Sequence, residues 1–301
     1  MSVLPSAGNG KVTVPGILQR KSGVSSQSSS CGQKYSPAKI TCLTAYDYPT
    51  ARLLDEAGVD VLLVGDSLAM VVLGYESTLP VTLEEMLHHT RAVRRGTRHA
   101  LLVADMPYGS YHDDPMQAVR NAVRFVKEAG AEAVKIEGGE RRMDLIQRLV
   151  EAEIPVMGHI GLTPQSFNAL GGFHVQGKTE EAGEQLLRDA LAVEAAGAFA
   201  IVLESIPRDL AAKVTAKLRI PTIGIGAGPD CDGQILVIND LLGLSFGHHP
   251  KFVRRYADVG ELVSRAAAEY CRDVQQGSFP ADNESYHLVA EHRDAPVVER
   301  R

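Results

Sequence analysis

Short apolar runs alternate with longer stretches of helical pattern along the chain from Lys39 onward. The short runs are rich in β-branched residues and stay apolar over their whole length, which is typical of parallel strands covered on both faces. We expect strands at residues 39–46, 59–65, 99–105, 131–137, 153–159, 198–204, 220–226 and 241–245. The helical patterns that separate and follow them cover residues 50–58, 83–96, 115–130, 142–152, 180–197, 208–218 and 259–277.

Glycines mark where several of these helices end. The sequence EAG or AAG stands at 56–58, 128–130 and 195–197, and glycine suits the left-handed residue that ends a helix before the next strand. Repeated strand–helix units with fully apolar strands indicate a (β/α)8 barrel. An open doubly wound sheet is the alternative, but no G-x-G-x-x-G follows the first strand. The glycine cluster at 223–228 indicates either a phosphate site or a tight turn.

Charge and composition narrow the function classes. The 301-residue chain has a formal net charge of −6 with both signs mixed throughout, so we expect no basic surface for nucleic acid. No apolar run approaches the roughly 18–20 residues that span a bilayer, and the N-terminus lacks a secretory signal pattern. We therefore expect a soluble, cytoplasmic protein. No C-x-x-C pair occurs among the cysteines, so we expect free thiols at Cys31, Cys42, Cys231 and Cys271.

The two ends of the chain differ in composition from the predicted barrel domain, which we assign to residues 39–280. Residues 1–38 combine a helical pattern at 14–21 with a serine-rich arm at 25–30. The arm is typical of a flexible linker, although the lack of acidic residues in this region is shared by organelle transit peptides. Residues 281–301 form a charged tail that we expect to be mobile.

Five consecutive predicted strands end in a titratable residue. In a barrel the carboxyl ends of all strands meet on one face, so side chains far apart in sequence surround a common cavity. We therefore expect one site that contains Asp66, Ser67, Asp105, Glu137, His159 and Glu204.

The fourth strand carries a lysine and a glutamate two positions apart, Lys135 and Glu137. Residues two apart on a strand point the same way, so both side chains face the cavity or lie beneath it. An ion pair between Lys135 and an aspartate of the neighbouring strand explains the lysine but not the surplus of acids. Three carboxylates at one barrel mouth repel unless a cation compensates them. We expect Mg²⁺ held by Asp66, Asp105 and Glu137, because all-oxygen ligands favour it over zinc.

His159 and Glu204 each allow two interpretations. A neutral imidazole at 159 serves equally as a satisfied core histidine or as a substrate contact. Glu204 follows the apolar run at 201–203, and apolar neighbours favour proton uptake by a carboxylate, which suits a general base. The alternative is a glutamate that ends its strand in solvent.

At these residues the chain resembles a known family. The strings LTAYDYP, VGDSLAMVVLGY, TLPVTLEEM, VADMPYGSY, VKIEGGE, GHIGLTPQS, EAAGAFAIVLE, IGIGAGPDCDGQILV and PKFVRRYADVG occur in this order. Together they closely resemble the ketopantoate hydroxymethyltransferase family, from about Val12 to Phe279. Ala69 and His174 depart from the family pattern, where glycine and a basic residue are usual.

The resemblance implies a barrel of the phosphoenolpyruvate/isocitrate lyase type with bound Mg²⁺. It also implies that the protein forms a homo-oligomer, namely a decamer. It implies hydroxymethyl transfer from 5,10-methylenetetrahydrofolate to 3-methyl-2-oxobutanoate, the first committed step of pantothenate synthesis. By the matching motifs, Asp66 and Ser67 carry metal and keto-acid contacts and Asp105 is a second metal ligand. Lys135 touches the substrate, Glu137 lies on the metal's side, and Glu204 is the proton acceptor.

Three other interpretations keep the barrel. The first is carbon–carbon lyase or phosphoenolpyruvate-type chemistry, which shares enolate stabilisation on Mg²⁺. The second is a phosphosugar isomerase that uses the glycine cluster at 223–228 to hold phosphate. The third is a non-catalytic binding module. The set of buried like charges argues against it, because such charges destabilise a protein and are not expected where they have no function.

Overall fold

The computed structural model describes residues 10–21, 38–247 and 250–288. The chain forms two compact units that divide between Tyr256 and Ala257. The serine-rich arm at 25–30, Cys31 and residues 289–301 of the predicted tail lie outside the described residues. Among the residues that are described, no helix is both long and apolar enough to cross a membrane.

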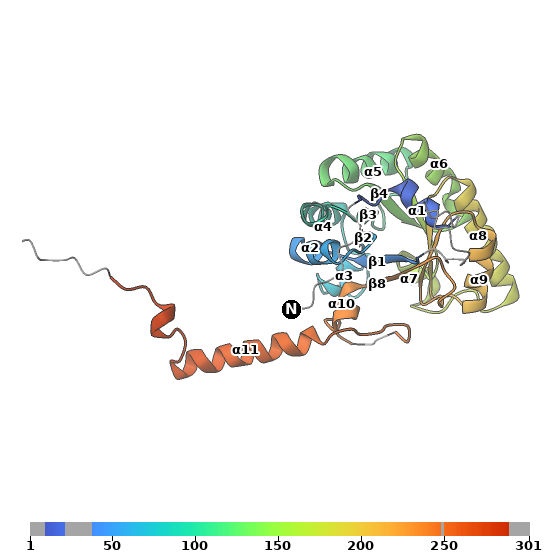
Figure 1. The fold of residues 1–301 in the computed structure, drawn as a ribbon. Coiled ribbons are helices and arrows are strands. Elements are labelled where there is room, and N and C mark those ends of the chain that lie inside the picture. Colours follow the sequence, from blue (N-terminus) through green and yellow to red (C-terminus); the bar gives the residue numbers. More distant parts are fainter. Residues whose placement is uncertain (1–9, 22–37, 248–249, 289–301) are drawn as a thin grey trace, which may run out of the picture. The chain divides into compact units, whose positions relative to one another are not determined.

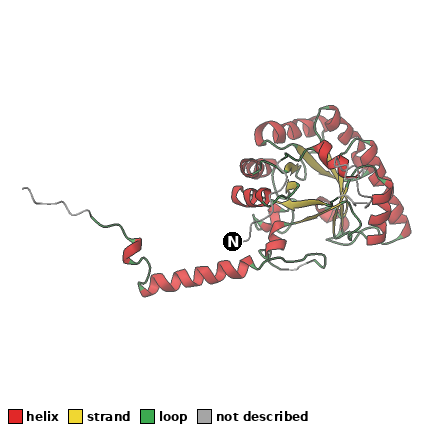
Figure 2. Cartoon of the chain, in the orientation of Figure 1, coloured by secondary structure: helices red, strands yellow, loops and turns green. Residues whose placement is uncertain are grey.

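The first unit is a closed barrel of parallel strands in sequence order, with the last strand paired to the first (Figures 1 and 2). This confirms the predicted (β/α)8 class. The strands are β1 Ile40–Thr44, β2 Val61–Val64, β3 Leu101–Asp105, β4 Ala133–Glu137, β5 Val156–Gly161, β6 Ala200–Glu204, β7 Thr222–Ile225 and β8 Gly233–Leu236.

Helices surround the strands (Figure 2). The main ones are α2 Tyr48–Glu56, α4 Leu83–Gly96, α5 Pro115–Ala129, α6 Met143–Glu151, α8 Glu180–Ala195 and α9 Arg208–Lys217. Shorter segments are α3 Leu68–Val71, α7 Phe167–Leu170, α10 Ile238–Leu242, and the 3-10 turns η1 Glu140–Arg142 and η2 Pro164–Ser166. The glycine ends are confirmed, since Gly58, Gly130 and Gly197 have φ of 84°, 73° and 97°.

Alternation along the strands divides the apolar residues into two cores. Leu62 and Val64 pack outward with the helices, whereas Val61 and Leu63 belong to the core inside the barrel. The same parity on β4 puts Val134 and Ile136 outward. Lys135 and Glu137 therefore point into the barrel, because they alternate with these two residues. The charged side chains of this buried strand thus lie inside the barrel and not among the helices.

The prediction of the eighth strand at 241–245 is wrong. β8 is Gly233–Leu236, and its residues pair with β1 from Ile40 to Leu43. Its sequence, GQIL, lacks the continuous apolar run of the other strands, because it begins with glycine and glutamine. Gln234 is exposed, and Gly233 approaches the β1 backbone closely. A Cβ at Gly233 would lie 2.6 Å from the carbonyl oxygen of Ile40. The predicted segment instead contributes to α10, which ends at the left-handed Gly243.

The helix predicted at 14–21 is present as α1 Val14–Lys21 and closes the amino end of the barrel. Ile17 is fully buried in the core inside the barrel. Arg20 donates to both carboxylate oxygens of Asp60 at 2.7 and 2.5 Å, and Lys21 pairs with Asp232 at 2.8 Å. The buried Ile17 side chain and the two ion pairs together hold this helix against the residues that precede β2 and β8.

The second unit contains α11 Val259–Gln276 and the 3-10 turn η3 Asp282–Glu284. The helix pattern at 259–277 is thus confirmed. The predicted barrel domain at 39–280 includes this helix, whereas the chain divides into its two compact units between Tyr256 and Ala257. Cys271 in this helix, like Cys42 and Cys231 in the barrel, is a free thiol as expected.

Candidate active site

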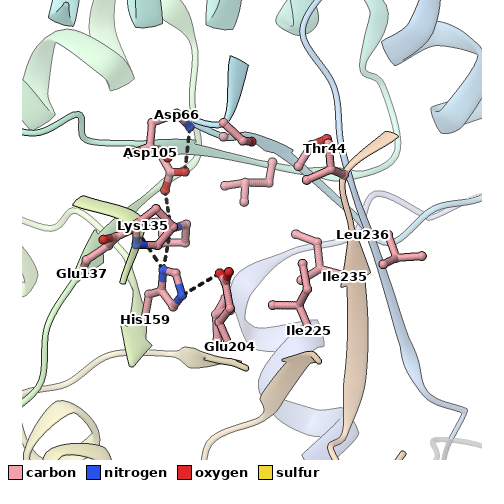
Figure 3. Close-up of a pocket in the computed structure, with 16 residues that line it drawn as sticks. Thr44, Asp66, Asp105, Lys135, Glu137, His159, Glu204, Ile225, Ile235 and Leu236 are labelled. Carbon is pink, nitrogen blue, oxygen red and sulfur yellow. Dashed lines mark hydrogen bonds and ion pairs between the residues drawn. The ribbon is translucent and has the colours of Figure 1, made fainter. Parts of the chain in front are cut away.

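The side chains expected at the ends of the strands meet in one cavity at the carboxyl end of the barrel (Figure 3). The cavity has a volume of about 100 Å³. Its lining includes every candidate from the sequence: Asp66, Ser67, Asp105, Lys135, Glu137, His159 and Glu204. The structure thus brings these residues together, while their individual roles stay predictions.

Lys135 is buried among the acids. It is the register partner of Asp105 on the neighbouring strand, and its Nζ lies 2.8 Å from Asp105 Oδ1 and 3.8 Å from Glu137 Oε1. Burial lowers the pKa of Lys135, but the carboxylates of Asp105 and Glu137 outweigh burial and raise the pKa above its usual range. The alternative ion pair between Lys135 and an aspartate of the neighbouring strand is therefore present, and it lies within the site.

His159 connects β4 to β6. Its Nδ1 lies 3.2 Å from Glu137 Oε1 and its Nε2 lies 3.2 Å from Glu204 Oε2 (Figure 3). Burial and Lys135, whose Nζ is 3.1 Å from Nδ1, lower the pKa of His159. The carboxylates of Glu137 and Glu204 outweigh both effects and raise this pKa to about 9. His159 is therefore a bridge between two site carboxylates and not an isolated core histidine.

Glu204 is the last residue of β6, and 17% of its side chain is exposed. It shares the cavity with the apolar side chains of Val202, Ile225 and Ile235 (Figure 3). The interpretation of Glu204 as a solvent-exposed strand end is therefore wrong. The next residue, Ser205, has a φ of 47°, a left-handed conformation that is uncommon outside glycine. The chain thus turns sharply at the residue after the carboxylate.

Asp66 and Ser67 follow β2. Asp66 lies on the opposite side of the cavity from Glu204 (Figure 3). The backbone N–H of Asp66 donates to Asp105 Oδ2 at 3.0 Å, which sets the two aspartates side by side. Burial and the negative charges of Asp105 and Glu137 raise the pKa of Asp66 well above its ordinary value. The Ser67 hydroxyl is 2.9 Å from that of Tyr46. Two acids so close together store electrostatic repulsion that a cation would relieve.

The donor atoms of the site fit a hard divalent cation. Asp105 Oδ1 and Glu137 Oε1 are buried carboxylate oxygens whose neighbours are the cationic groups of Lys135 and His159. Within the described residues, no three His, Cys, Asp or Glu side chains form a ready-made metal cluster. Mg²⁺, however, is commonly held by only one or two protein carboxylates together with water and substrate oxygens. Asp66, Asp105 and Glu137 therefore suit Mg²⁺ as oxygen donors, directly or through water.

Sequence reasoning missed two polar residues that contact these acids, Tyr111 and Gln165. The Gln165 side-chain amide donates to Asp66 Oδ2 at 2.8 Å, and its backbone N–H donates to Glu137 Oε2 at 3.0 Å. Tyr111 donates its hydroxyl hydrogen to Gln165 Oε1 at 2.6 Å. Both lie in loops after strands, where periodicity carries no information. The only signal was their presence in the strings VADMPYGSY and GHIGLTPQS.

The glycine cluster at 223–228 forms a tight turn after β7. Gly226 and Gly228 have φ of 65° and 80°. A Cβ at Gly226 would lie 2.6 Å from the ring of Phe252, and one at Gly228 would lie 2.6 Å from the Arg208 side chain. Close packing therefore accounts for the glycines, which supports the turn interpretation over a phosphate site.

Comparison with known proteins identifies the family. A profile of the family described as "Ketopantoate hydroxymethyltransferase" matches residues 28–282. A curated 3-methyl-2-oxobutanoate hydroxymethyltransferase from Koribacter versatilis (strain Ellin345) is 60% identical over 291 residues, which cover 97% of this chain and 94% of the relative. One of the same name from Geobacter sulfurreducens is 57% identical over 248 residues, covering 82% and 93%.

Solved structures with similar folds have much lower sequence identity. A 2,3-dimethylmalate lyase, described as a PEP mutase/isocitrate lyase superfamily member, is 19% identical with a TM-score of 0.53, covering 83% of this chain and 87% of that one. A phosphonopyruvate hydrolase in complex with oxalate and Mg²⁺ is 15% identical with a TM-score of 0.53, covering 82% and 88%. These likenesses show a shared barrel fold. On the profile match and the sequence identities, the chain belongs to the ketopantoate hydroxymethyltransferase family.

Proposed function

We propose that this protein transfers a hydroxymethyl group from 5,10-methylenetetrahydrofolate to 3-methyl-2-oxobutanoate in a Mg²⁺-dependent reaction, giving 2-dehydropantoate for pantothenate synthesis. The observation that carries the proposal is the cavity in which Asp66 and Asp105 lie across from Glu204, with Lys135 and His159 between them (Figure 3). Family membership selects this reaction among the enolate-forming reactions that such a cavity suits.

The keto acid carries a carboxylate oxygen and a ketone oxygen, and we place both toward Asp66, Ser67 and Asp105. Asp66, Asp105 and Glu137 would hold Mg²⁺, and the bound ion would supply Lewis-acid polarisation of the ketone, which would make the C3 hydrogen acidic. Lys135, 2.8 Å from Asp105 Oδ1, supplies a fixed positive charge on the same side of the cavity. That charge stabilises the negative charge that develops on the ketone oxygen.

Glu204 accepts the C3 proton in this account. The residue lies at the apolar end of the cavity, where Val202, Ile225 and Ile235 surround the branched carbon of the substrate and exclude water. His159 Nε2, at 3.2 Å from Glu204 Oε2, orients the carboxylate. Carbon C3 then forms a bond to the one-carbon unit of the folate, and water supplies the hydroxyl oxygen to the same carbon. Both carbon–nitrogen bonds of that unit break, and the protons lost from C3 and from water pass to the two folate nitrogens, which leaves tetrahydrofolate.

The folate donor is larger than the first cavity. A second cavity of about 640 Å³ also has Glu137 in its lining, together with Arg141, Arg142 and Asp189. We place the outer part of the folate there, because the two arginines offer cationic groups to the carboxylates of its glutamate tail.

The proposal for the assembly is that the protein acts as a homo-oligomer, a decamer by family resemblance. Light scattering measures that state.

A folate-dependent transfer assay tests the proposal. Purified protein with Mg²⁺, 3-methyl-2-oxobutanoate and 5,10-methylenetetrahydrofolate should form 2-dehydropantoate, detected by mass spectrometry, and thorough chelation should stop the reaction. Cleavage of a carbon–carbon bond in a 2-hydroxy diacid, without folate-dependent transfer, would instead assign lyase chemistry to the site.

A further inference from the structure

Gln165 contacts two of the acids in the site and is itself 5% exposed. It lies in the turn η2 Pro164–Ser166, after β5. Its Nε2 donates to Asp66 Oδ2 at 2.8 Å and to the carbonyl oxygen of Met106 at 3.0 Å, and its Oε1 accepts the hydroxyl hydrogen of Tyr111 at 2.6 Å. One side chain therefore joins the ends of β2 and β3 to the loop after β5.

The orientation of this amide is set by its three partners. Asp66 Oδ2 and the Met106 carbonyl only accept hydrogen bonds, so both require the NH₂ end of the amide. The Tyr111 hydroxyl accepts from the backbone N–H of Glu137 at 3.0 Å, which leaves its hydrogen for Gln165 Oε1. A flipped amide would face oxygen toward two acceptors and lose all three bonds. Gln165 is therefore a fixed donor to one oxygen of Asp66.

The same residue also holds Glu137. The backbone N–H of Gln165 donates to Glu137 Oε2 at 3.0 Å. The other oxygen, Glu137 Oε1, is buried and lies 3.2 Å from His159 Nδ1 and 3.8 Å from Lys135 Nζ. Gln165 thus engages one oxygen of each acid, Oδ2 of Asp66 and Oε2 of Glu137. Neither Asp66 Oδ1 nor Glu137 Oε1 bonds to Gln165, and both residues line the cavity.

We propose that Gln165 is a positioning residue that presents Asp66 and Glu137 to a divalent cation, with Tyr111 fixing its amide. This inference rests on the proposed function, since it requires that cation. Hydrogen bonds to ligating carboxylates set their orientation, and loss of such an outer partner typically weakens metal affinity about 10–100-fold. Gln165 touches no reacting atom in this account, so its loss affects metal binding and leaves the chemistry of the loaded site in place.

The test measures Mn²⁺ affinity, with Mn²⁺ as a paramagnetic stand-in for Mg²⁺, by electron paramagnetic resonance of the full chain. Gln165→Met, which keeps the length of the side chain but has no donor, should bind Mn²⁺ about tenfold or more weakly than the wild type. Its kcat at saturating Mn²⁺ should approach the wild-type value, because excess metal restores occupancy. Gln147→Met, at an exposed position on α6, is the matched control and should bind Mn²⁺ like the wild type.

Tyr111→Phe provides a second, milder variant, since it removes one oxygen atom and with it the hydrogen-bond donor to Gln165 Oε1. It should weaken Mn²⁺ binding in the same direction by about threefold or more. Wild-type Mn²⁺ affinity in either Gln165→Met or Tyr111→Phe would overturn the role of Gln165 alone and leave the proposed function standing. A wild-type protein that binds no Mn²⁺ in the presence of the keto acid would overturn the metal site and the role of Gln165 with it.

Discussion

Nε2 of His159 and Oε2 of Glu204 lie 3.2 Å apart across neighbouring strands, with both side chains in the same cavity. The other ring nitrogen of His159 faces Glu137 at the same distance. The imidazole therefore links the carboxylate proposed to take the proton with a carboxylate on the metal side. This pairing predicts that the two ring nitrogens of His159 have separable effects.

His159→Asn and His159→Gln test this separation. Asn retains a polar group near the position of Nδ1, and Gln retains one near Nε2. His159→Asn should slow exchange of the C3 hydrogen of the keto acid by about tenfold or more, because Glu204 loses its orienting partner. His159→Gln should retain more of the exchange. Equal rates in the two variants, measured by proton NMR in D₂O, would contradict the orienting role of Nε2.

The pKa of His159 predicts how stability depends on pH in the metal-free protein. Its pKa is raised from the ordinary 6.5 to about 9 in the folded state, so the folded state binds the proton more tightly than the unfolded state. The stabilisation is fully present below pH 6.5 and is lost as the pH rises through about 9. The free energy of unfolding should fall across this window by on the order of 2 kcal/mol more in the wild type than in His159→Gln. The free energy of unfolding is measured by urea unfolding of both proteins from pH 6 to 10. The same pH dependence in the two proteins would contradict this role of His159.

Lys135 neutralises part of the charge of Asp105 and Glu137 in the buried cluster. Lys135→Met should lower the free energy of unfolding by about 3–5 kcal/mol, because removal of one partner leaves buried carboxylates uncompensated. Added Mg²⁺ should restore part of that loss, since the cation replaces the missing positive charge. Urea unfolding with and without Mg²⁺ measures both effects. Lys213→Met, at an exposed position on α9, is the control and should change neither.

The helix α1 should contribute to stability without affecting catalysis. Arg20→Ala leaves Asp60, which is 9% exposed, without its bidentate partner, and should cost about 1–3 kcal/mol in thermal or urea unfolding. The matched control is Arg52→Ala, because Arg52 and Glu56 are each 59% exposed and such a pair contributes about 0.5 kcal/mol or less. A loss in Arg20→Ala no larger than in Arg52→Ala would mean that α1 is not fixed by this ion pair.

Most of the fold and the site was predictable from the sequence because both follow from strand parity and strand ends. Lys135 and Glu137 share a face because they lie two residues apart on β4, and the barrel brings Asp66 and Glu204 to one end. β8 was not predictable by the same reasoning, since a strand of four residues with Gly233 and an exposed Gln234 has no apolar period.

The hydrogen bonds that Gln165 and Tyr111 make around the acids could not be predicted from the sequence either. Gln165 and Tyr111 meet although they are 54 positions apart, and each lies in a loop whose course depends on the tertiary fold. The sequence leaves open whether Lys135 pairs with Asp105 or the acids hold a metal, and the structure accommodates both. Residue types and spacing identified the charged groups but not which partner each carboxylate oxygen has.

The central claim is that Glu204 removes the C3 proton of a keto acid held on the opposite side of the cavity. The most direct measurement is exchange of that hydrogen with solvent deuterium, followed by NMR without folate. The wild type with Mg²⁺ should exchange it, and Glu204→Gln should exchange it about 10²–10⁴-fold more slowly while still binding the keto acid. Glu151→Gln, at an exposed position on α6, should behave like the wild type. Exchange at the wild-type rate in Glu204→Gln would contradict the claim.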